Sequence, residues 1–233
     1  MSLFSTTQMK CPKCGESTSA EEVGSVNADR RPDLRDAILA GTFQTIKCSH
    51  CGHRFRLEPD FNYMDAGRGQ WIAAYPAPRI LDHLEAADEM SAVFENNFGA
   101  AAGKAEQELG KSLTGRVVFG WPAMREKLLI RDRGLDDVIV ELLKLDLLRE
   151  LPEIPFGAGT ALRLVELAGP DMTFAWFGPG VGDSQRVLDI GISRYQDIAS
   201  HMDEWKDVAD ELTDSAFVDM QKLYLGEGRD AQA

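Results

Sequence analysis

The sequence predicts an α+β protein in two parts, and three observations support this prediction. Of the 233 residues, 44% are apolar and 27% are charged, which is the balance of an ordinary globular protein. Two matching Cys-x-x-Cys-Gly motifs stand near the N-terminus. Segments that alternate between polar and apolar residues are mixed with segments of helical periodicity. At this length, one or two domains are expected.

The first domain is expected to span residues 1–79 and to combine short strands with one helix. A helix is predicted at 32–40, because Pro32 suits a first helical turn and Gly41 suits the cap after the last turn. The sequence Tyr-Pro-Ala-Pro at 75–78 stiffens the chain and marks the end of the domain. Strands are predicted at 21–28, 53–58 and 70–75.

A helical connector is expected over residues 80–113. Apolar residues recur at helical spacing in 80–98. The stretch 99–112, which contains several alanines and glycines, is interpreted as either a linker or a solvated helix, and both interpretations stay open.

The second domain, residues 114–233, is expected to contain a helical pair and a small antiparallel sheet. A short strand at 116–119 precedes the pair, Pro122 begins its first helix and Gly134 separates the two helices. The turn sequence Gly-Pro-Asp at 169–171 predicts a hairpin. Strands are predicted at 161–167, 172–177 and 186–192. A final amphipathic helix is predicted from the spacing of Tyr195, Ile198, Ala199, Met202 and Trp205.

Acidic residues are concentrated in the second part of the chain. The protein has 25 Lys and Arg and 38 Asp and Glu, a formal net charge of −13. Residues 1–80 carry ten basic and nine acidic residues, whereas residues 81–233 carry 15 and 29. An acidic body repels nucleic-acid phosphates. Nucleic acid is therefore not expected as a partner, and any contact with it would fall to the N-terminal part.

The sequence predicts a cytoplasmic protein. Its first residues show no basic segment followed by an apolar one, as a signal peptide would. No apolar stretch approaches the ~18 residues that a membrane span needs. We therefore expect no membrane association.

The four cysteines, Cys11, Cys14, Cys48 and Cys51, predict a metal site. Two pairs at Cys-x-x-Cys spacing in a cytosolic chain favour a metal over disulfides. Zn²⁺ prefers four tetrahedral ligands and binds thiolates well, and the glycine after each pair lets the backbone fold back toward the sulfurs. Four thiolates close the shell, so we expect a structural Zn²⁺ ion in a zinc-ribbon-like domain.

Two features around the motifs leave alternatives open. His50 or His53 could replace a cysteine as a ligand, because sites with three cysteines and one histidine exist. The 33 residues between the pairs exceed the ~15–20 of compact ribbons, but the predicted helix at 32–40 can fill the insert. Basic side chains surround both motifs, where they either offset the thiolate charge or form a nucleic-acid patch. They are Lys10, Lys13, Lys47, Arg54 and Arg56.

Residues 5–79 resemble the CpXC-domain proteins of bacteria and archaea. The resemblance rests on CPKCG, PDLRDAILAGTF, the second CxxCGHRF and FNYMDAGRGQWIAAYP. It implies a zinc-binding domain in which the four cysteines are the ligands, and it implies no established activity. Ser49 stands where the family pattern has proline, which affects the stiffness of the turn but removes no ligand. The stretch WPAMREKLLIRDRGLDDVIVELLKL also resembles the segment that comes after this domain in family members.

Three other motifs are interpreted as structural. AEQELGKS (105–112) matches a loose phosphate-loop pattern, but no apolar strand precedes it and its glutamates would face the phosphates. FGPGVGD (177–183) lies between predicted strands and is interpreted as a hairpin loop. Asp136 and Asp137 suit a first helical turn, although a metal or catalytic role stays open. Glu141, one turn later, fits a solvated face.

The favoured function is a protein-interaction or adaptor module. A closed metal shell, an acidic surface and the lack of a recognisable catalytic set in the sequence support it. A nucleic-acid-binding zinc ribbon is the first alternative, and it requires the five basic residues to share one exposed face. An enzyme with an inter-domain cleft is the second, and it requires acids and a histidine to converge. We expect a protein partner and leave homo-oligomer formation open.

Overall fold

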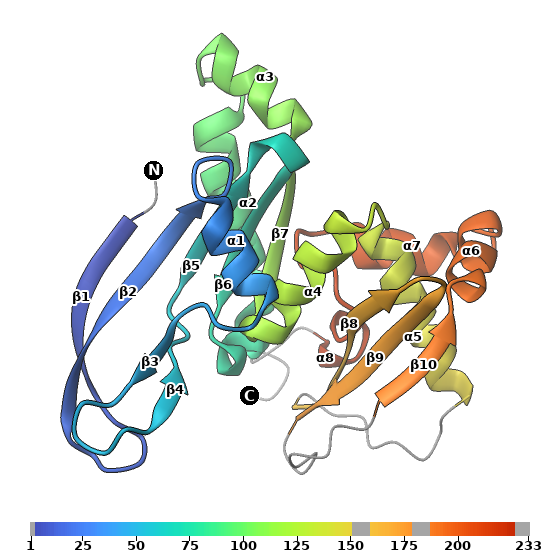
Figure 1. Cartoon of the computed structure of the whole chain (residues 1–233). Helices are drawn as coiled ribbons and strands as arrows, with labels where there is room; N and C mark the ends of the chain where they lie inside the picture. The colour runs from blue at the N-terminus through green and yellow to red at the C-terminus, as the bar shows by residue number, and fades with distance from the viewer. Residues whose placement is uncertain (1–2, 151–158, 179–186, 227–233) are drawn as a thin grey trace. The chain divides into compact units, whose positions relative to one another are not determined.

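The computed structural model describes residues 3–150, 159–178 and 187–226, which form two compact units (Figure 1). Unit 1 combines residues 1–78 with 93–121, and unit 2 combines 79–92 with 122–233. The fold is a mixture of helices and sheets, as predicted. The predicted domain limits at 79 and 113 stay a prediction, because a grouping by contacts does not test which part folds on its own.

Unit 1 is built on a mixed five-stranded sheet with the order β1-β2-β5-β6-β7. The pairs β1–β2 and β5–β6 are antiparallel, whereas β2–β5 and β6–β7 are parallel. The bounds are β1 Leu3–Lys10, β2 Ser17–Asn27, β5 Phe61–Asp65, β6 Gln70–Tyr75 and β7 Thr114–Phe119. The strands predicted near 21–28, 70–75 and 116–119 are confirmed, but β1 and β5 were not predicted.

Three helices accompany this sheet in the chain order. Helix α1 (Pro32–Leu39) begins at Pro32, and Gly41 after it has φ +73°, as its predicted capping role requires. Helices α2 (His83–Phe98) and α3 (Lys104–Ser112) lie in the chain between β6 and β7. The stretch 105–112 is therefore helical, in line with the solvated-helix interpretation and not with a phosphate loop.

Aromatic side chains of α2 cover part of the sheet. The rings of Phe94 and Phe98 lie 5.5 and 5.6 Å from the ring of Trp71 on β6. Gly110 on α3 passes so close to α2 that an added Cβ would lie 2.6 Å from the Cβ of Phe98. A glycine is needed at this position because the two helices touch there.

A second, two-stranded sheet consists of β3 (Thr45–Lys47) and β4 (Arg54–Arg56). The predicted strand at 53–58 is thus shorter than expected. An aromatic cluster lies next to it: the rings of Phe43 and Phe61 are 5.3 and 5.5 Å from that of Trp121. The indole N–H of Trp121 donates to the Leu57 carbonyl over 2.7 Å. The cluster therefore anchors the segment that follows the hairpin.

Unit 2 contains the predicted helical pair and antiparallel sheet. The helices are α4 (Gly120–Asp132) and α5 (Asp137–Glu150). The sheet has the order β10-β9-β8 and is antiparallel throughout, with β8 Ala161–Ala168, β9 Asp171–Phe177 and β10 Val187–Gly191. The predicted β8–β9 hairpin is confirmed, while most of the predicted loop 177–183 lies outside the described residues.

The C-terminal helix predicted to run from Tyr195 to Trp205 is wrong in its length. Helix α6 (Ser193–Ser200) ends before His201, and α7 (Lys206–Thr213) and α8 (Lys222–Leu225) follow. The hydroxyl of Ser200 and Nδ1 of His201 both lie within 2.9 Å of the Asp197 carbonyl oxygen. Side chains that compete for a helix carbonyl favour termination at that point. Within the described part of the chain, no helix is long and apolar enough to cross a membrane.

Candidate metal centre

Each cysteine motif occupies the turn of a β-hairpin. The first turn, Cys11–Gly15, joins β1 to β2, and the second, Cys48–Gly52, joins β3 to β4. The four Sγ atoms all lie within 4.8 Å of one another. The Sγ atoms of Cys11 and Cys51 are 3.7 Å apart, as are those of Cys14 and Cys48. The structure therefore brings together all four residues that the sequence singled out, at metal-binding distance.

The two turns have the same backbone hydrogen bonds. The N–H of the first cysteine donates to the carbonyl five residues later, on Glu16 or His53, over 2.9 and 2.8 Å. The glycine N–H donates back to the first cysteine's carbonyl over 2.9 and 3.0 Å. Gly15 and Gly52 have φ of +75° and +70°, a region in which other residues are strained. The two Cys-x-x-Cys-Gly motifs thus specify the same turn conformation at two places in the chain.

The distances between the sulfurs fit a tetrahedral metal with thiolate ligands. A disulfide would bring two sulfurs to about 2.0 Å, so separations of 3.7 Å belong to unlinked thiols. Zn–S bonds of about 2.3 Å place the corners of a regular tetrahedron about 3.8 Å apart. In both turns the first cysteine is buried, whereas Cys14 and Cys51 face solvent. The centre is therefore half-exposed.

The thiols influence one another's ionisation. Burial opposes ionisation of Cys11, yet the N–H groups of Cys14 and Lys13 lower its pKa to about 7. The N–H of Cys51 likewise lowers the pKa of Cys48. For Cys14, the N–H of Glu16 favours the thiolate, but burial and the neighbouring sulfurs raise its pKa to about 12. The raised pKa of Cys14 shows that a further thiolate is unfavourable beside its neighbours, and a bound cation would relieve that repulsion.

Ser49, the departure from the family pattern, contacts the other hairpin. Its backbone N–H points at the hydroxyl of Thr18 on β2 over 3.4 Å, and its own hydroxyl lies 3.4 Å from the same oxygen. Proline could not donate the first of these bonds, because it lacks an N–H. The serine therefore adds a weak polar link between the two hairpins.

The structure favours neither the alternative histidine ligands nor a single patch of the five basic residues. Among the described residues, the group that could hold a metal here consists of the four cysteines and includes neither His50 nor His53. The ring of His53 stacks on Phe55, with 6.2 Å between centroids. Arg56 donates through Nε to the Phe43 carbonyl over 2.8 Å and stacks over Trp121 at 4.5 Å. The five basic residues therefore do not share one exposed face, although Lys10, Lys13, Lys47 and Arg54 are exposed.

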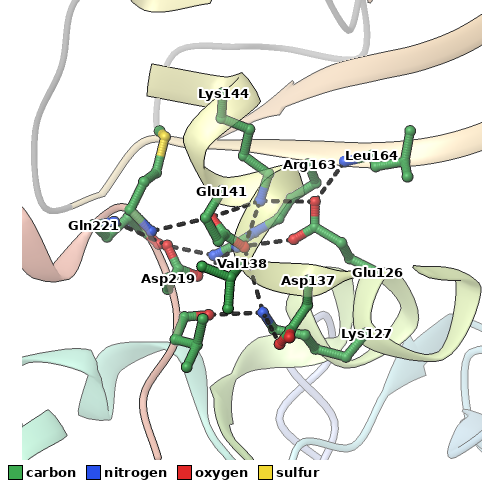
Figure 2. Close-up of polar contacts among 12 residues, drawn as sticks. Glu126, Lys127, Asp137, Val138, Glu141, Lys144, Arg163, Leu164, Asp219 and Gln221 are labelled. Carbon is green, nitrogen blue, oxygen red and sulfur yellow. Dashed lines mark hydrogen bonds and ion pairs between the residues drawn. The ribbon is translucent and has the colours of Figure 1, made fainter. Parts of the chain in front are cut away.

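A second cluster of chemically capable side chains lies in unit 2 (Figure 2). Lys144 is fully buried and donates to the carboxylates of Glu126 and Glu141, over 2.8 and 2.9 Å. Arg163 on β8 bonds Glu126 and Asp219. The network comprises Glu126, Lys127, Asp137, Glu141, Lys144, Arg163, Asp219 and Gln221. It joins α4, α5 and β8 to the segment before α8.

The acids in this network are occupied by partners. Oε1 of Glu126 and Oε2 of Glu141, both of which Lys144 contacts, also accept the backbone N–H groups of Leu164 and Met220, over 2.6 and 3.0 Å. Burial raises the pKa of Glu141 although Lys144 opposes the shift. The solvated face predicted for Glu141 is therefore wrong, because tertiary packing covers it. Such a satisfied network makes the packing of this part of unit 2 specific.

The sequence contained a signal for the burial of this network, which the prediction of a solvated face for Glu141 did not use. Glu141 and Lys144 stand three residues apart within the apolar stretch of α5, so most of their other neighbours on the helix are apolar. The nearby acids play smaller roles. Asp136 accepts the N–H of Val138 over 2.8 Å as a helix cap, and Asp137 binds Lys127 over 2.9 Å.

A shallow hollow of about 500 Å³ in unit 2 brings His201 near acids. The carbonyl and carboxylate of Asp197 raise the pKa of His201. The two side chains are 54% and 79% exposed, however, and Oδ1 of Asp197 is 3.6 Å from Nδ1. The hollow is lined by Asp146, Arg149, Asp197, Ile198, His201, Glu204, Trp205 and Val208. A solvated pair at one helix end accounts for this arrangement without a ligand.

The comparisons with known proteins agree with the cysteine geometry. The family model described as CpXC protein matches residues 9–144. Neither the comparison with curated proteins nor that with solved structures found a match. The matched segment contains both cysteine turns and more than half of the chain. The resemblance noted in the sequence is thereby confirmed, and the chain belongs to the CpXC family.

Proposed function

We propose that the four cysteines hold one structural Zn²⁺ ion and that the protein serves as a cytoplasmic protein-interaction or adaptor module. The observation that carries the proposal is the sulfur geometry. Four Sγ atoms from two matched turns lie within 4.8 Å of one another, with two separations of 3.7 Å. The two separations of 3.7 Å are close to the ~3.8 Å between ligands of a tetrahedral ZnS₄ centre, which supports the choice of zinc.

A structural role follows from the ligand number. Catalytic zinc ions keep a position for water or substrate, whereas four thiolates complete the shell. The strands β3 and β4 have three residues each, and an isolated two-stranded hairpin of this kind is marginal in water. An ion that binds both turns would fasten β3–β4 to β1–β2, in the manner of a zinc ribbon.

The chemistry of the ligands supports the choice of ion and compartment. Thiolates select soft or borderline metals, and zinc with four cysteines is a common structural combination. Thiols persist in the reducing cytoplasm and oxidise outside it.

The interaction role rests on the closed shell and on charge. With four thiolate ligands, the ion has no open coordination position and takes no direct part in a reaction. The metal centre would instead fix the conformation of the protein surface around it. Residues 81–233 carry 15 basic and 29 acidic residues, which favours a basic protein surface as a partner and disfavours phosphates.

The metal assignment is tested by elemental analysis of the purified protein, with thiols titrated before and after chelation. We expect one zinc per chain and four thiols that react only after the chelator is added. Cys51→Ser should lose the metal, while Ser19→Ala, an exposed serine on β2, should keep it. Bound iron, or fewer than four protected thiols, would contradict the structural zinc centre.

The interaction role needs a separate test. Proximity labelling in cells should mark a protein with the wild type and Ser19→Ala but not with Cys51→Ser. Nucleic-acid binding by the four exposed basic residues predicts instead an affinity that falls steeply with salt and weakens in Lys13→Glu. If the protein binds nucleic acid in this salt-dependent way and no protein is labelled in cells, nucleic-acid binding would replace the adaptor role as the proposed function.

A further inference from the structure

Strand β1 (Leu3–Lys10) ends the five-stranded sheet of unit 1, and its outer edge has no strand beside it among the described residues. Its inner edge is paired with β2 over its whole length, from Leu3 opposite Ser25 to Lys10 opposite Ser17. None of its side chains is buried. Leu3 and Phe4 are adjacent on the strand and are 65% and 39% exposed.

Such an edge normally carries protection against pairing. Proteins block open edges with charges, prolines or bulges, because the free N–H and C=O groups are a template for another strand. From Leu3 to Met9, β1 contains no charge and no proline. Its pairing with β2 is irregular only between Leu3 and Phe4, so the stretch from Phe4 onward is regular. The edge is therefore open to a further strand.

We propose that β1 pairs antiparallel with β1 of a second copy of this chain, about a twofold axis at Thr6. The sequence of the strand is complementary to itself in this register. Ser5 meets Thr7 and Thr6 meets Thr6, and cross-strand hydroxyl pairs of this kind are favourable. Phe4 meets Gln8 and Leu3 meets Met9, so each exposed apolar side chain gains a long partner. Lys10 stays outside the paired stretch.

The charge distribution favours a second copy at this edge. The chain has a net charge of −13, but residues 1–80 carry ten basic and nine acidic residues. An uncharged strand in this nearly neutral part is where two copies approach with least repulsion. The guanidinium of Arg31 lies 5.5 Å from the centre of the Phe4 ring, and it is paired with Asp33 while also attracting Glu21 of β2.

Sedimentation equilibrium of the full chain tests the proposal with charges placed at the axis. Wild type should form a dimer that dissociates on dilution. In Thr6→Lys, and separately in Thr6→Glu, like charges face each other, and the dissociation constant should rise about fivefold or more. An equimolar mixture of the two variants should recover the dimer, because lysine then faces glutamate.

Two controls keep the outcome decisive. Ser19→Lys puts a charge on β2, away from the outer edge, and should dimerise as wild type does. Four thiols that react only after a chelator is added, in every variant, show that the hairpin still forms, including in Thr6→Glu, where the new acid lies opposite Glu21. A monomeric wild type, or a dimer that survives both Thr6 substitutions, or variants that the mixture does not rescue, would each overturn the proposal. If β1 pairs with a strand of a different protein instead, the purified wild type would be monomeric, which is the first of these results.

Discussion

At the scale of single residues, unit 2 depends on a lysine that water does not reach. Lys144 has no exposed side-chain area, and its ammonium group lies between two carboxylates that are equally buried. Burying ions is costly, and their mutual attraction offsets that cost only while every partner is present. The network therefore makes each member sensitive to the loss of another.

Lys144→Met should lower the free energy of unfolding by about 3–5 kcal/mol, because Glu126 and Glu141 would be left buried without their shared cation. Urea unfolding followed by circular dichroism measures the change, and the zinc content should stay the same. Lys111→Met is the matched control: Lys111 is 70% exposed in its pair with Glu108, and its loss should cost below about 0.5 kcal/mol. Equal effects of the two substitutions would contradict the role of burial.

Ser49→Pro tests the departure from the family pattern. Serine is not a ligand, so the protein should keep one zinc and four protected thiols per chain. The loss of the 3.4 Å bond to Thr18 should lower stability by less than about 1 kcal/mol. Ser49→Ala, which keeps the N–H, should lie between wild type and Ser49→Pro. Loss of the metal in Ser49→Pro alone would show that the turn cannot accept proline.

At the scale of elements, the two cysteine turns make the same strict demand on the backbone. Each needs a residue with positive φ directly after its second cysteine, and glycine meets the demand in both. The two residues between the cysteines of each turn can vary, because the hydrogen bonds that close the turn run between backbone atoms.

Gly52→Ala should lower the free energy of unfolding by about 1–2 kcal/mol and weaken zinc binding. The added Cβ would lie 3.6 Å from Cε of Lys47, an ordinary contact, so the cost comes from the φ of +70°. Gly24→Ala in β2 is the control, because nothing lies within 4 Å of its added Cβ and its φ is not positive. Zinc competition with a chromogenic chelator and urea unfolding measure both effects. Equal losses in the two variants would contradict the argument from backbone strain.

At the scale of the whole molecule, the two units are stabilised by different kinds of interaction. Unit 1 relies on the cysteine turns and an aromatic cluster, whereas unit 2 relies on the ionic network and an apolar core. Removal of the metal should therefore affect one unit more than the other.

If the cysteines hold the proposed zinc, its removal by a chelator should speed amide exchange in the hairpins β1–β2 and β3–β4, while α4, α5 and β8 keep their protection. Hydrogen exchange read by mass spectrometry on the full chain measures this difference, and Cys51→Ser should reproduce the chelated pattern. Uniform loss of protection along the chain would show instead that the metal stabilises the molecule as a single cooperative unit.

Much of the secondary structure was predictable because its signals are local. The strands near 70–75 and 161–177 and the helix at Pro32 follow from alternation, turn residues and caps that a few neighbours provide. Strand β1 escaped prediction because nothing buries either of its faces, so its residues show no alternation. The end of α6 before His201 was not predicted, because competition of side chains for one carbonyl oxygen does not change the hydrophobic periodicity of the sequence.

The sequence by itself determined the candidate metal centre, since Cys-x-x-Cys-Gly specifies a turn through contacts within five residues and the need for four ligands pairs the two turns. Only the tertiary structure decided which charges are buried and which edges stay open. The apolar stretch around Glu141 and Lys144 hinted at their burial, but only the contacts with Glu126 on α4 and Met220 before α8 show which groups surround them. Likewise, β7 becomes the neighbour of β6 only by a parallel pairing across nearly forty residues of chain. Such outcomes depend on the sum of many long-range contacts, which no local pattern records.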